Sequence, residues 1–234
     1  MNLEKYQQYS RIARGLEKAD LVLKDARIVN VFTEEIIRGD IAIQDGIIAG
    51  IGSFHGKEER DLAGRYVCPG FIDSHLHLES TLVTPAELVT VASRHGTTTF
   101  IVDPHESANV SGLAGVDYIL DQTENVKANV YVMMPSCVPA TSIDDNGCTL
   151  TAEDMAPYLH NSRILGLGEV MDSISVVQGE KSMHDKLELF EGRIRDGHAP
   201  FLEEGDLQAY AMAGIATDHE CSFFDYAMRE RRNG

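Results

Sequence analysis

Residues 67–77 read Val-Cys-Pro-Gly-Phe-Ile-Asp-Ser-His-Leu-His, a short apolar stretch that ends in two histidines. His75 and His77 are two positions apart, so on an extended strand both imidazoles point to the same face. Two neutral imidazoles on one face form a ready chelate for a metal ion. From this stretch onward the pattern of the sequence changes, and we take it as the first strand of the main domain.

The sequence after residue 67 alternates short apolar runs with helical stretches. Strands are expected at 67–73, 98–103, 129–134, 164–170, 192–197 and 213–218, and helices at 84–95, 113–126, 151–160, 182–190, 206–213 and 223–232. This spacing is typical of βα units and a parallel sheet. Six such units fit either an open, doubly wound sheet or most of an eight-stranded barrel.

Residues 1–66 have a different pattern. The first twenty predict a short amphipathic helix, and residues 21–31 are rich in β-branched side chains. Residues 40–52 hold Asp45-Gly46 between two apolar runs, which is the strongest short-range signal for a β-hairpin. We therefore expect two domains, a helix with a small β module in residues 1–66 and an α/β domain in residues 67–234.

The composition limits the class of partner. Lys and Arg number 20 and Asp and Glu 37, which gives a net charge of −17 and a repulsion from nucleic acids and anionic membranes. No apolar run reaches the roughly 20 residues of a membrane-spanning helix, and the N-terminal residues lack the apolar core of a secretory signal. The four cysteines form no C-x-x-C pair. We expect a cytoplasmic protein that binds neither nucleic acid nor membrane.

Polar side chains follow several of the expected strands. They are His75 and His77 after the first strand, His105 and Glu106 after the second, Glu169 at the end of the fourth, His198 after the fifth, and His219 and Glu220 after the sixth. The carboxyl ends of parallel strands meet at one edge of a sheet, so this pattern predicts a metal site there. Two alternatives remain open: Glu169 could cap the following segment, and His105 with Glu106 could simply begin a helix.

Several other catalytic motifs are absent. Neither His105-Glu106 nor His219-Glu220 continues into H-E-x-x-H, and residues 135–139 do not supply the P-C-x-x-C half of the zinc nucleobase-deaminase signature. The sequence also has no phosphate-binding G-x-x-x-x-G-K-[ST] loop, no G-x-G-x-x-G after a strand and no G-x-S-x-G elbow. Hydrolysis by metal-activated water is the chemistry that remains.

The motifs resemble, in order and position, those of the amidohydrolase superfamily, and within it those of the bacterial adenine deaminases. They are residues 67–77, His77-Leu-Glu-Ser80, Asp103-Pro-His-Glu106, Pro135-Ser-Cys-Val-Pro139, Gly168-Glu-Val-Met-Asp172, Asp196-Gly-His-Ala-Pro200 and Asp218-His-Glu220. The resemblance is narrowed by the D-P-H-E and G-E-x-M-D segments, which distinguish this group from dihydroorotase-like and deacetylase-like relatives. The resemblance implies an α/β fold, an incomplete (β/α)8 TIM-type barrel of about six βα units preceded by part of a small β-sandwich.

The same resemblance implies a set of metal ligands. His75 and His77 would hold one metal, Glu169 would bridge two metals, and His198 and His219 would hold the second. The implied centre is binuclear, with Mn²⁺ expected and Fe²⁺ as the alternative. Three further residues would contact the substrate or transfer protons: His105, Glu106 and Glu220. The resemblance does not assign either role to a particular one of them.

The reaction implied by the resemblance is the hydrolysis of adenine to hypoxanthine and ammonia, in purine salvage or adenine catabolism. The superfamily places an essential Asp at the end of the eighth barrel strand, whereas six units are found here, so we expect an N-terminal fragment. Another cyclic amidohydrolase, an inactive remnant, or a subunit that completes its barrel with a second chain are the alternatives. The oligomeric state stays open, a homo-oligomer included.

Overall fold

The computed structural model describes residues 1–141 and 143–234. Its internal contacts divide the chain into two compact units, Met1–Pro69 and Gly70–Gly234. Each unit has its own sheet, one of five strands and one of six. None of the helices in the described parts of the chain has the length and apolarity needed to cross a bilayer.

The first unit is a small sheet with one helix. It comprises α1 (Leu3–Ala13), β1 (Ala19–Asn30), β2 (Glu35–Gln44), β3 (Ile47–Gly52), β4 (Gly56–Asp61) and β5 (Tyr66–Val67). The strand order is β3-β2-β1-β4, and β5 pairs with β1. The predicted hairpin is confirmed: β2 and β3 are antiparallel, and Asp45 and Gly46 in the turn have φ angles of 51° and 75°.

The core of this unit lies between α1 and the sheet. Ile12 of the helix packs with Val22 and Phe54 in one cluster of buried side chains. Beside it, the Lys24 ammonium donates to the Asp40 carboxylate at 2.5 Å and to the Phe54 carbonyl oxygen at 2.9 Å. The half-buried ammonium therefore has its charge and its hydrogen bonds satisfied, as burial of a charged group requires.

The second unit is built on a six-stranded parallel sheet. Its strands are β6 (Phe71–Leu76), β7 (Thr97–Val102), β8 (Asn129–Pro135), β9 (Ile164–Val170), β10 (Ile194–Gly197) and β11 (Thr217–Asp218). The order in space is the order in sequence, from β6 to β11, and each neighbouring pair is parallel. This arrangement brings the carboxyl ends of all the strands to one edge.

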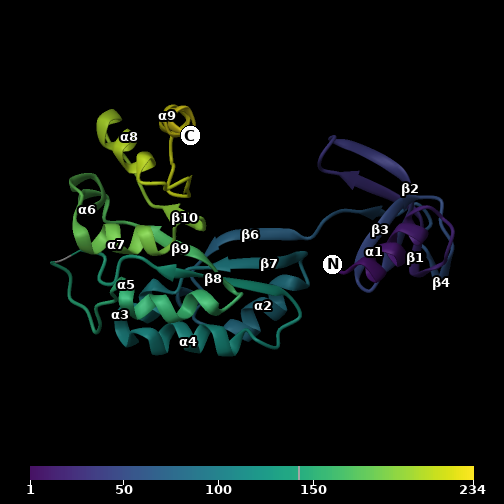
Figure 1. The fold of residues 1–234 in the computed structure, drawn as a ribbon, viewed down its shortest axis with the longest axis horizontal. Helices are drawn as coiled ribbons and strands as arrows, with labels where there is room; N and C mark the ends of the chain where they lie inside the picture. Colours follow the sequence, from purple (N-terminus) through teal and green to yellow (C-terminus); the bar gives the residue numbers. More distant parts are fainter. Residues whose placement is uncertain (142) are drawn as a thin grey trace. The chain divides into compact units, whose positions relative to one another are not determined.

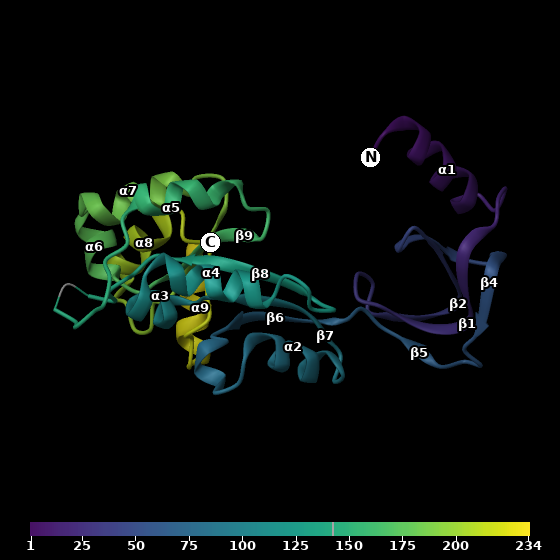
Figure 2. The same cartoon turned by 90° about the horizontal axis from the view of Figure 1, so that it is seen from below.

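Helices lie around the outer side of this curved sheet (Figure 1 and Figure 2). They are α2 (Pro85–Ser93), α3 (His105–Ser111), α4 (Leu113–Gln122), α5 (Ala152–Met155), α6 (Ser173–Gln178), α7 (Lys181–Leu189), α8 (Glu204–Met212) and α9 (Phe224–Asn233), with short 3₁₀ turns at Glu79–Thr81 and Ala156–His160. Phe100 of β7 and Ile119 of α4 belong to the buried cluster between the two layers. Full burial of a side chain of this size stabilises the fold by about 1.5–3 kcal/mol.

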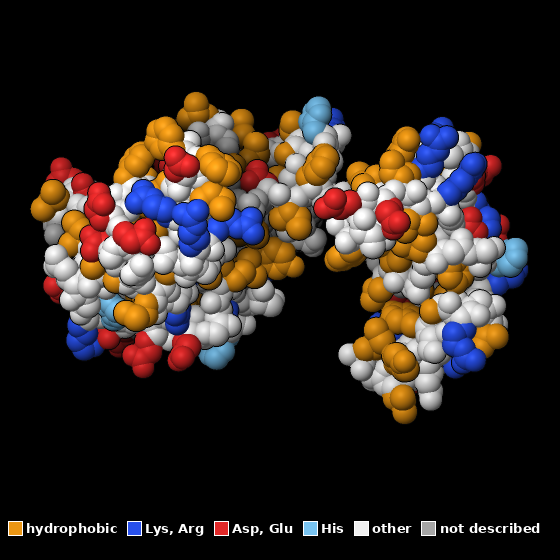
Figure 3. Space-filling model, turned by 90° about the horizontal axis from the view of Figure 1, so that it is seen from above, with side chains coloured by type: hydrophobic (Ala, Val, Ile, Leu, Met, Phe, Trp, Pro, Cys, Tyr) orange, Lys and Arg blue, Asp and Glu red, His pale blue; other side chains and the backbone are white. Residues whose placement is uncertain are grey.

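The inner side of the sheet carries a layer of apolar side chains. Ile101, Met133, Leu165 and Ile194 come from four neighbouring strands and line a cavity of about 290 Å³. Inward-facing aliphatic side chains of this kind fill the interior of a βα barrel. On the outside, Figure 3 shows acidic and basic side chains intermixed with exposed hydrophobic ones.

Several elements differ from the expectation. The strand expected at 213–218 is reduced to the two residues of β11, and the helix expected at 151–160 is the four-residue α5 followed by a 3₁₀ turn. The strand expected at 67–73 is two strands, because Pro69-Gly70 interrupts it: β5 pairs with β1 of the first unit, and β6 begins the second sheet. The helix expected at 113–126 is preceded by α3. The helix α6 was not expected, since its β-branched residues have low helix propensity; the Asp172 side chain caps it by accepting from Ser175 N.

Candidate metal centre

The predicted metal ligands lie together at the carboxyl edge of the six-stranded sheet. His75 is in β6, His77 directly follows it, and Glu169 is in β9. His198 and His219 each come one residue after a strand, β10 and β11 respectively. Because the strands are parallel and in sequence order, five side chains that span 145 residues of chain reach one place.

Glu169 is at the centre of this cluster and is 3% exposed. Its Oε1 lies 2.6 Å from His75 Nε2 and 2.9 Å from His77 Nε2. The same oxygen is 3.3 Å from His219 Nε2, while Oε2 is 3.6 Å from His198 Nδ1. The two carboxylate oxygens thus face different histidines.

Several sets of three side chains could each hold a metal ion, with ligand atoms within 4.8 Å of one another. They are His75-His77-Glu169, Glu169-His198-His219, His75-Asp196-His219, Asp103-His105-Glu169 and His77-Glu79-Glu106. The first two sets share Glu169 and together contain the five predicted ligands. A shared carboxylate suits a pair of divalent ions because each oxygen can take one of them.

Hydrogen bonds fix the orientation of two of the histidine rings. Nδ1 of His77 lies 2.8 Å from the backbone carbonyl of Asp103, which can only accept, so this nitrogen carries the proton. Nδ1 of His219 lies 3.1 Å from the Asp196 carboxylate in the same way. In both rings Nε2 faces Glu169 and is the nitrogen that could bind a metal once its proton is lost. A histidine ligand usually has its other nitrogen held in this way by a carbonyl or carboxylate oxygen.

Two acidic residues of the cluster, Asp196 and Asp103, were missed by the sequence analysis. Asp196 contacts Nδ1 of both His75, at 3.3 Å, and His219, at 3.1 Å. It stands two positions before His198, so the same two-residue spacing that identified the first pair of histidines could have found it.

Asp103 is 1% exposed and lies 3.6 Å from His105 Nδ1. A Cβ at Gly168 would come within 2.0 Å of its carboxylate, so the glycine leaves the space that Asp103 occupies. This is a close approach between two strand ends that a single sequence does not reveal.

The cluster contains an unusual number of buried polar atoms without a hydrogen-bond partner among the described residues. They are both carboxylate oxygens of Asp103, Nδ1 of His105, Nδ1 of His198 and Nε2 of His219. Buried polar groups are nearly always satisfied, and each exception needs an explanation. Imidazole nitrogens and carboxylate oxygens are together a donor set for divalent transition metals, so the residues present fit such an ion.

The electrostatics of the cluster favour positive charge. Burial lowers the pKa of His75, but hydrogen bonds to Asp196 and Glu169 outweigh it and raise the pKa to about 9. The hydrogen bond to Glu169 raises the pKa of His77 to about 9 against its burial, and the pKa of His219 rises to about 10 against its burial because of Asp196 and Glu169. Burial alone would raise the pKa of Glu169, yet the histidines hold it well below its usual range.

Metal affinity is therefore expected to rise with pH. A metal ion binds neutral imidazole and must displace the protons of His75, His77 and His219, whose pKa values of about 9 to 10 keep them charged through neutral pH. Calorimetric titration with Mn²⁺ between about pH 6.5 and pH 9, in buffers of different ionisation enthalpy, measures both affinity and proton release. An affinity that does not change over this range, with no proton released, would contradict the assignment.

The remaining predicted site residues occupy different positions. His105 begins α3, as one alternative anticipated, and its Nδ1 is also 3.6 Å from Glu169 Oε2. Glu106 is exposed, and its carboxylate accepts from the Ser80 hydroxyl. Glu220 is exposed too, and its backbone N–H donates to Asp218 at 3.1 Å. Of the three, His105 has its ring in the cluster.

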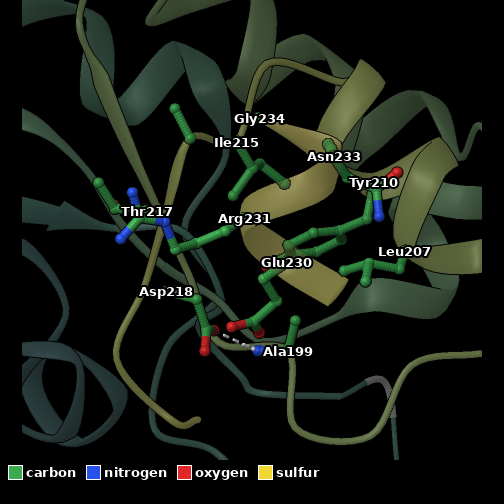
Figure 4. Close-up of a pocket in the computed structure, with 12 residues that line it drawn as sticks. Ala199, Leu207, Tyr210, Ile215, Thr217, Asp218, Glu230, Arg231, Asn233 and Gly234 are labelled. Atoms are coloured by element: carbon green, nitrogen blue, oxygen red, sulfur yellow. Dashed lines mark hydrogen bonds between the residues drawn. The ribbon is translucent and has the colours of Figure 1, made fainter. Parts of the chain in front are cut away.

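A second hollow of about 310 Å³ lies between α8, α9 and β11 (Figure 4). Tyr210 and Asp218 line it, together with Glu230 of the last helix. Asp218 accepts from Ala199 N at 2.7 Å, so its carboxylate is engaged in holding the loop after β10. None of the predicted ligands lines this hollow, whereas His75 and His219 line the inner cavity.

The chain is similar to known proteins both in sequence and in fold. The family model described as "Amidohydrolase family" matches residues 66–232. The chain is 57% identical to an adenine deaminase of Desulfitobacterium hafniense over 234 residues, which are 100% of this chain and 41% of that protein. It is 49% identical to an adenine deaminase of Clostridium acetobutylicum, with 95% of this chain and 39% of that protein covered. The chain thus spans about two fifths of the length of these curated relatives.

Two solved structures have a similar fold. An N-acyl-D-glutamate deacylase of Bordetella bronchiseptica, complexed with zinc and a phosphonate inhibitor, aligns with a TM-score of 0.63 at 18% identity, over 93% of this chain and 57% of that one. A 5-methylcytosine deaminase of Klebsiella pneumoniae aligns with a TM-score of 0.54 at 15% identity, over 91% and 62%. At these identities the likeness concerns the fold alone, and it confirms the expected barrel-type α/β architecture.

Proposed function

We propose, since the chain belongs to the amidohydrolase family, that it carries the metal centre of an adenine deaminase. The proposal is supported by the relatives that bear this name and match nearly the whole chain. The reaction converts adenine and water into hypoxanthine and ammonia. The oxygen of water forms a bond to C6 of the purine and the bond from C6 to the amino nitrogen breaks. Of the two protons that water gives up, one goes to N1 of the ring and the other to the amino nitrogen, which leaves as ammonia.

The observation that carries the proposal is the position of Glu169 between two groups of histidines. His75 and His77 would hold one ion, His198 and His219 the other, and the two oxygens of Glu169 would be shared. We propose Mn²⁺, with Fe²⁺ as the alternative, since both accept mixed imidazole and carboxylate ligands. When bound, such ions act as Lewis acids that lower the pKa of water to near neutrality.

The residues of the chain itself orient the reactants and move protons. Asp196 holds Nδ1 of His219, so that Nε2 of this ring stays directed toward Glu169. His105, between Asp103 and Glu169, is placed to take up or deliver a proton at its ring nitrogen. Glu106 and Glu220 we assign to contacts with the substrate at the open carboxyl edge.

The net charge supports a small-molecule substrate over a nucleic acid or an anionic membrane. All four cysteines are free thiols, which supports a reducing location, the cytoplasm. Both points agree with an enzyme of purine metabolism.

The test is release of ammonia from adenine by the chain loaded with Mn²⁺. We expect release that stops with a chelator and returns when Mn²⁺ is added again. Cytosine and a cyclic amide serve as comparison substrates, because another cyclic amidohydrolase would act on these instead. The assignment of adenine as substrate would be overturned if the chain with two bound metal ions converted a comparison substrate but released no ammonia from adenine. The proposed metal centre would stand in that case.

A further inference from the structure

A strand without a predicted metal ligand also contacts the centre. Ser136 directly follows β8 and is 1% exposed. Its hydroxyl donates to the backbone carbonyl of Glu169 at 2.6 Å. This carbonyl also accepts from Met171 N at 2.7 Å, so both of its lone pairs are used. The backbone at Glu169 is therefore held from the neighbouring strand as well as from its own.

The position of this hydrogen bond follows from the sheet. The ladder between β8 and β9 ends at the pair Pro135 and Gly168. Beyond that pair β8 no longer pairs with β9, and the Ser136 side chain supplies a hydrogen bond to Glu169 from this side, while on the other side the β9–β10 ladder continues to Val170 and Gly197. A buried hydroxyl that donates to a buried carbonyl satisfies two polar groups at once.

Lys186 fixes Ser136 in turn. This lysine of α7 is 8% exposed, and its ammonium donates to the backbone carbonyl of Ser136 at 2.7 Å. Burial of an amine is costly, and burial lowers the pKa of Lys186 even though Cys137, Asp172 and Asp154 oppose this. Among the described residues, the Lys186 ammonium donates to the Ser136 carbonyl oxygen. The cost of burying this amine is therefore offset by a contact that fixes the peptide group of Ser136.

A second contact joins the same two strand ends. The backbone N–H of Asp172 donates to the sulfur of Cys137 at 3.4 Å, and the Asp172 side chain caps α6. The residues after β8 thus hold the chain at both ends of the segment from Glu169 to Asp172. An error of about 1 Å in such a segment is enough to impair a catalytic geometry about 100-fold.

We propose that Ser136 and Lys186 are positioning residues of the metal centre. Through the chain of hydrogen bonds from Lys186 to Ser136 to the Glu169 carbonyl, they set the direction of the Glu169 carboxylate toward its two groups of histidines. The inference rests on the proposed bridging role of Glu169 and gives this role a structural support. Residues that orient metal ligands from behind contribute about 10–100-fold to metal affinity.

The test compares Ser136→Ala, Lys186→Met and the control Ser182→Ala in the full chain. Ser182 and Lys186 line one hollow of about 500 Å³, but the Ser182 side chain is exposed. Mn²⁺ affinity is measured by titration, and the coupling of two Mn²⁺ ions through a shared carboxylate by electron paramagnetic resonance. For Ser136→Ala we expect about 10–100-fold weaker binding and a partial change from the coupled to the isolated-ion spectrum. Lys186→Met should shift both readouts in the same direction, and Ser182→Ala should shift neither.

The outcomes separate this inference from the proposed function. One outcome would overturn the positioning role: Ser136→Ala and Lys186→Met bind coupled Mn²⁺ ions as well as the unchanged chain does. This outcome would leave the proposed deamination of adenine intact. An equal loss in Ser182→Ala would overturn the positioning role too. Conversely, a loss specific to Ser136→Ala and Lys186→Met supports the role even if adenine is not the substrate. Should Ser136→Ala fail to fold, Ser136→Thr, which keeps the hydroxyl, is expected to retain the coupled spectrum, and its loss would count against the proposal.

Discussion

Replacing Glu169 by Gln is expected to abolish binding of both proposed metal ions and with it the proposed deaminase activity. The two oxygens of this carboxylate face different histidines, so a change at Glu169 affects both halves of the cluster. An amide has the same shape but presents one acceptor and one donor, and the donor would face the position of a cation. Mutation of a residue that only orients a metal ligand typically lowers metal affinity by up to about 100-fold. For Glu169→Gln, which changes a ligand itself, we expect a larger fall in metal affinity.

The metal-free protein provides an independent readout of the same change. Hydrogen bonds to Glu169 contribute to the raised pKa values of His75 and His77, both about 9. Without the negative charge, these pKa values should fall toward the unperturbed value of about 6.5. Histidine signals followed by NMR across pH measure this directly. Glu188→Gln, an exposed carboxylate of α7, is the matched control and should leave the titrations unchanged.

If Glu169→Gln still bound two Mn²⁺ ions with the affinity of the unchanged chain, the shared-ligand arrangement would be wrong. A loss of only one ion would place Glu169 in a single site and assign the bridging position to another acidic residue. Asp196 is the nearest alternative, since it already contacts His75 and His219.

The strand ends are the part of this structure that sequence reasoning predicts well. The strand at 164–170 has the predicted bounds, because it begins with an apolar run, residues 164–168, that follows a polar segment. The period of two along β6 correctly placed His75 and His77 on one side, where both reach Glu169. The family membership expected from the motifs is likewise confirmed, by the match over residues 66–232.

What the sequence could not show are relations between strands. The contact of Asp196 with His219 depends on β10 lying next to β11, and its contact with His75 depends on the curvature that brings β6, at the far edge of the sheet, close to β10. The hydroxyl of Ser136 reaches Glu169 because the pairing of β8 with β9 ends one residue earlier. Local sequence patterns predict which residues lie at the end of a strand. Which of these residues contact one another depends on the order and pairing of the strands in the sheet.

The second large effect is expected from the histidines, which should divide into two groups. His75→Ala is expected to remove one metal ion and leave the other, and His198→Ala the reverse, because each histidine belongs to a different set around Glu169. Metal content after dialysis should fall from two ions per chain to about one in each variant, and to none in the double variant. His160→Ala, an exposed histidine in the last turn of the 3₁₀ segment Ala156–His160, should retain both ions.

Activity should be lost in both single variants, although each keeps one ion, because a pair of ions and a single ion stabilise developing charge differently. Metal content therefore distinguishes His75→Ala from Glu169→Gln, whereas activity does not. Ring stacking of His75 on His219, with centroids 3.5 Å apart, couples the two sets, so the ion that remains in His75→Ala should bind somewhat more weakly. Unchanged metal stoichiometry in both His75→Ala and His77→Ala would show that the pair on β6 is not a metal ligand, and the centre would have to be sought around Asp196 and His219 instead.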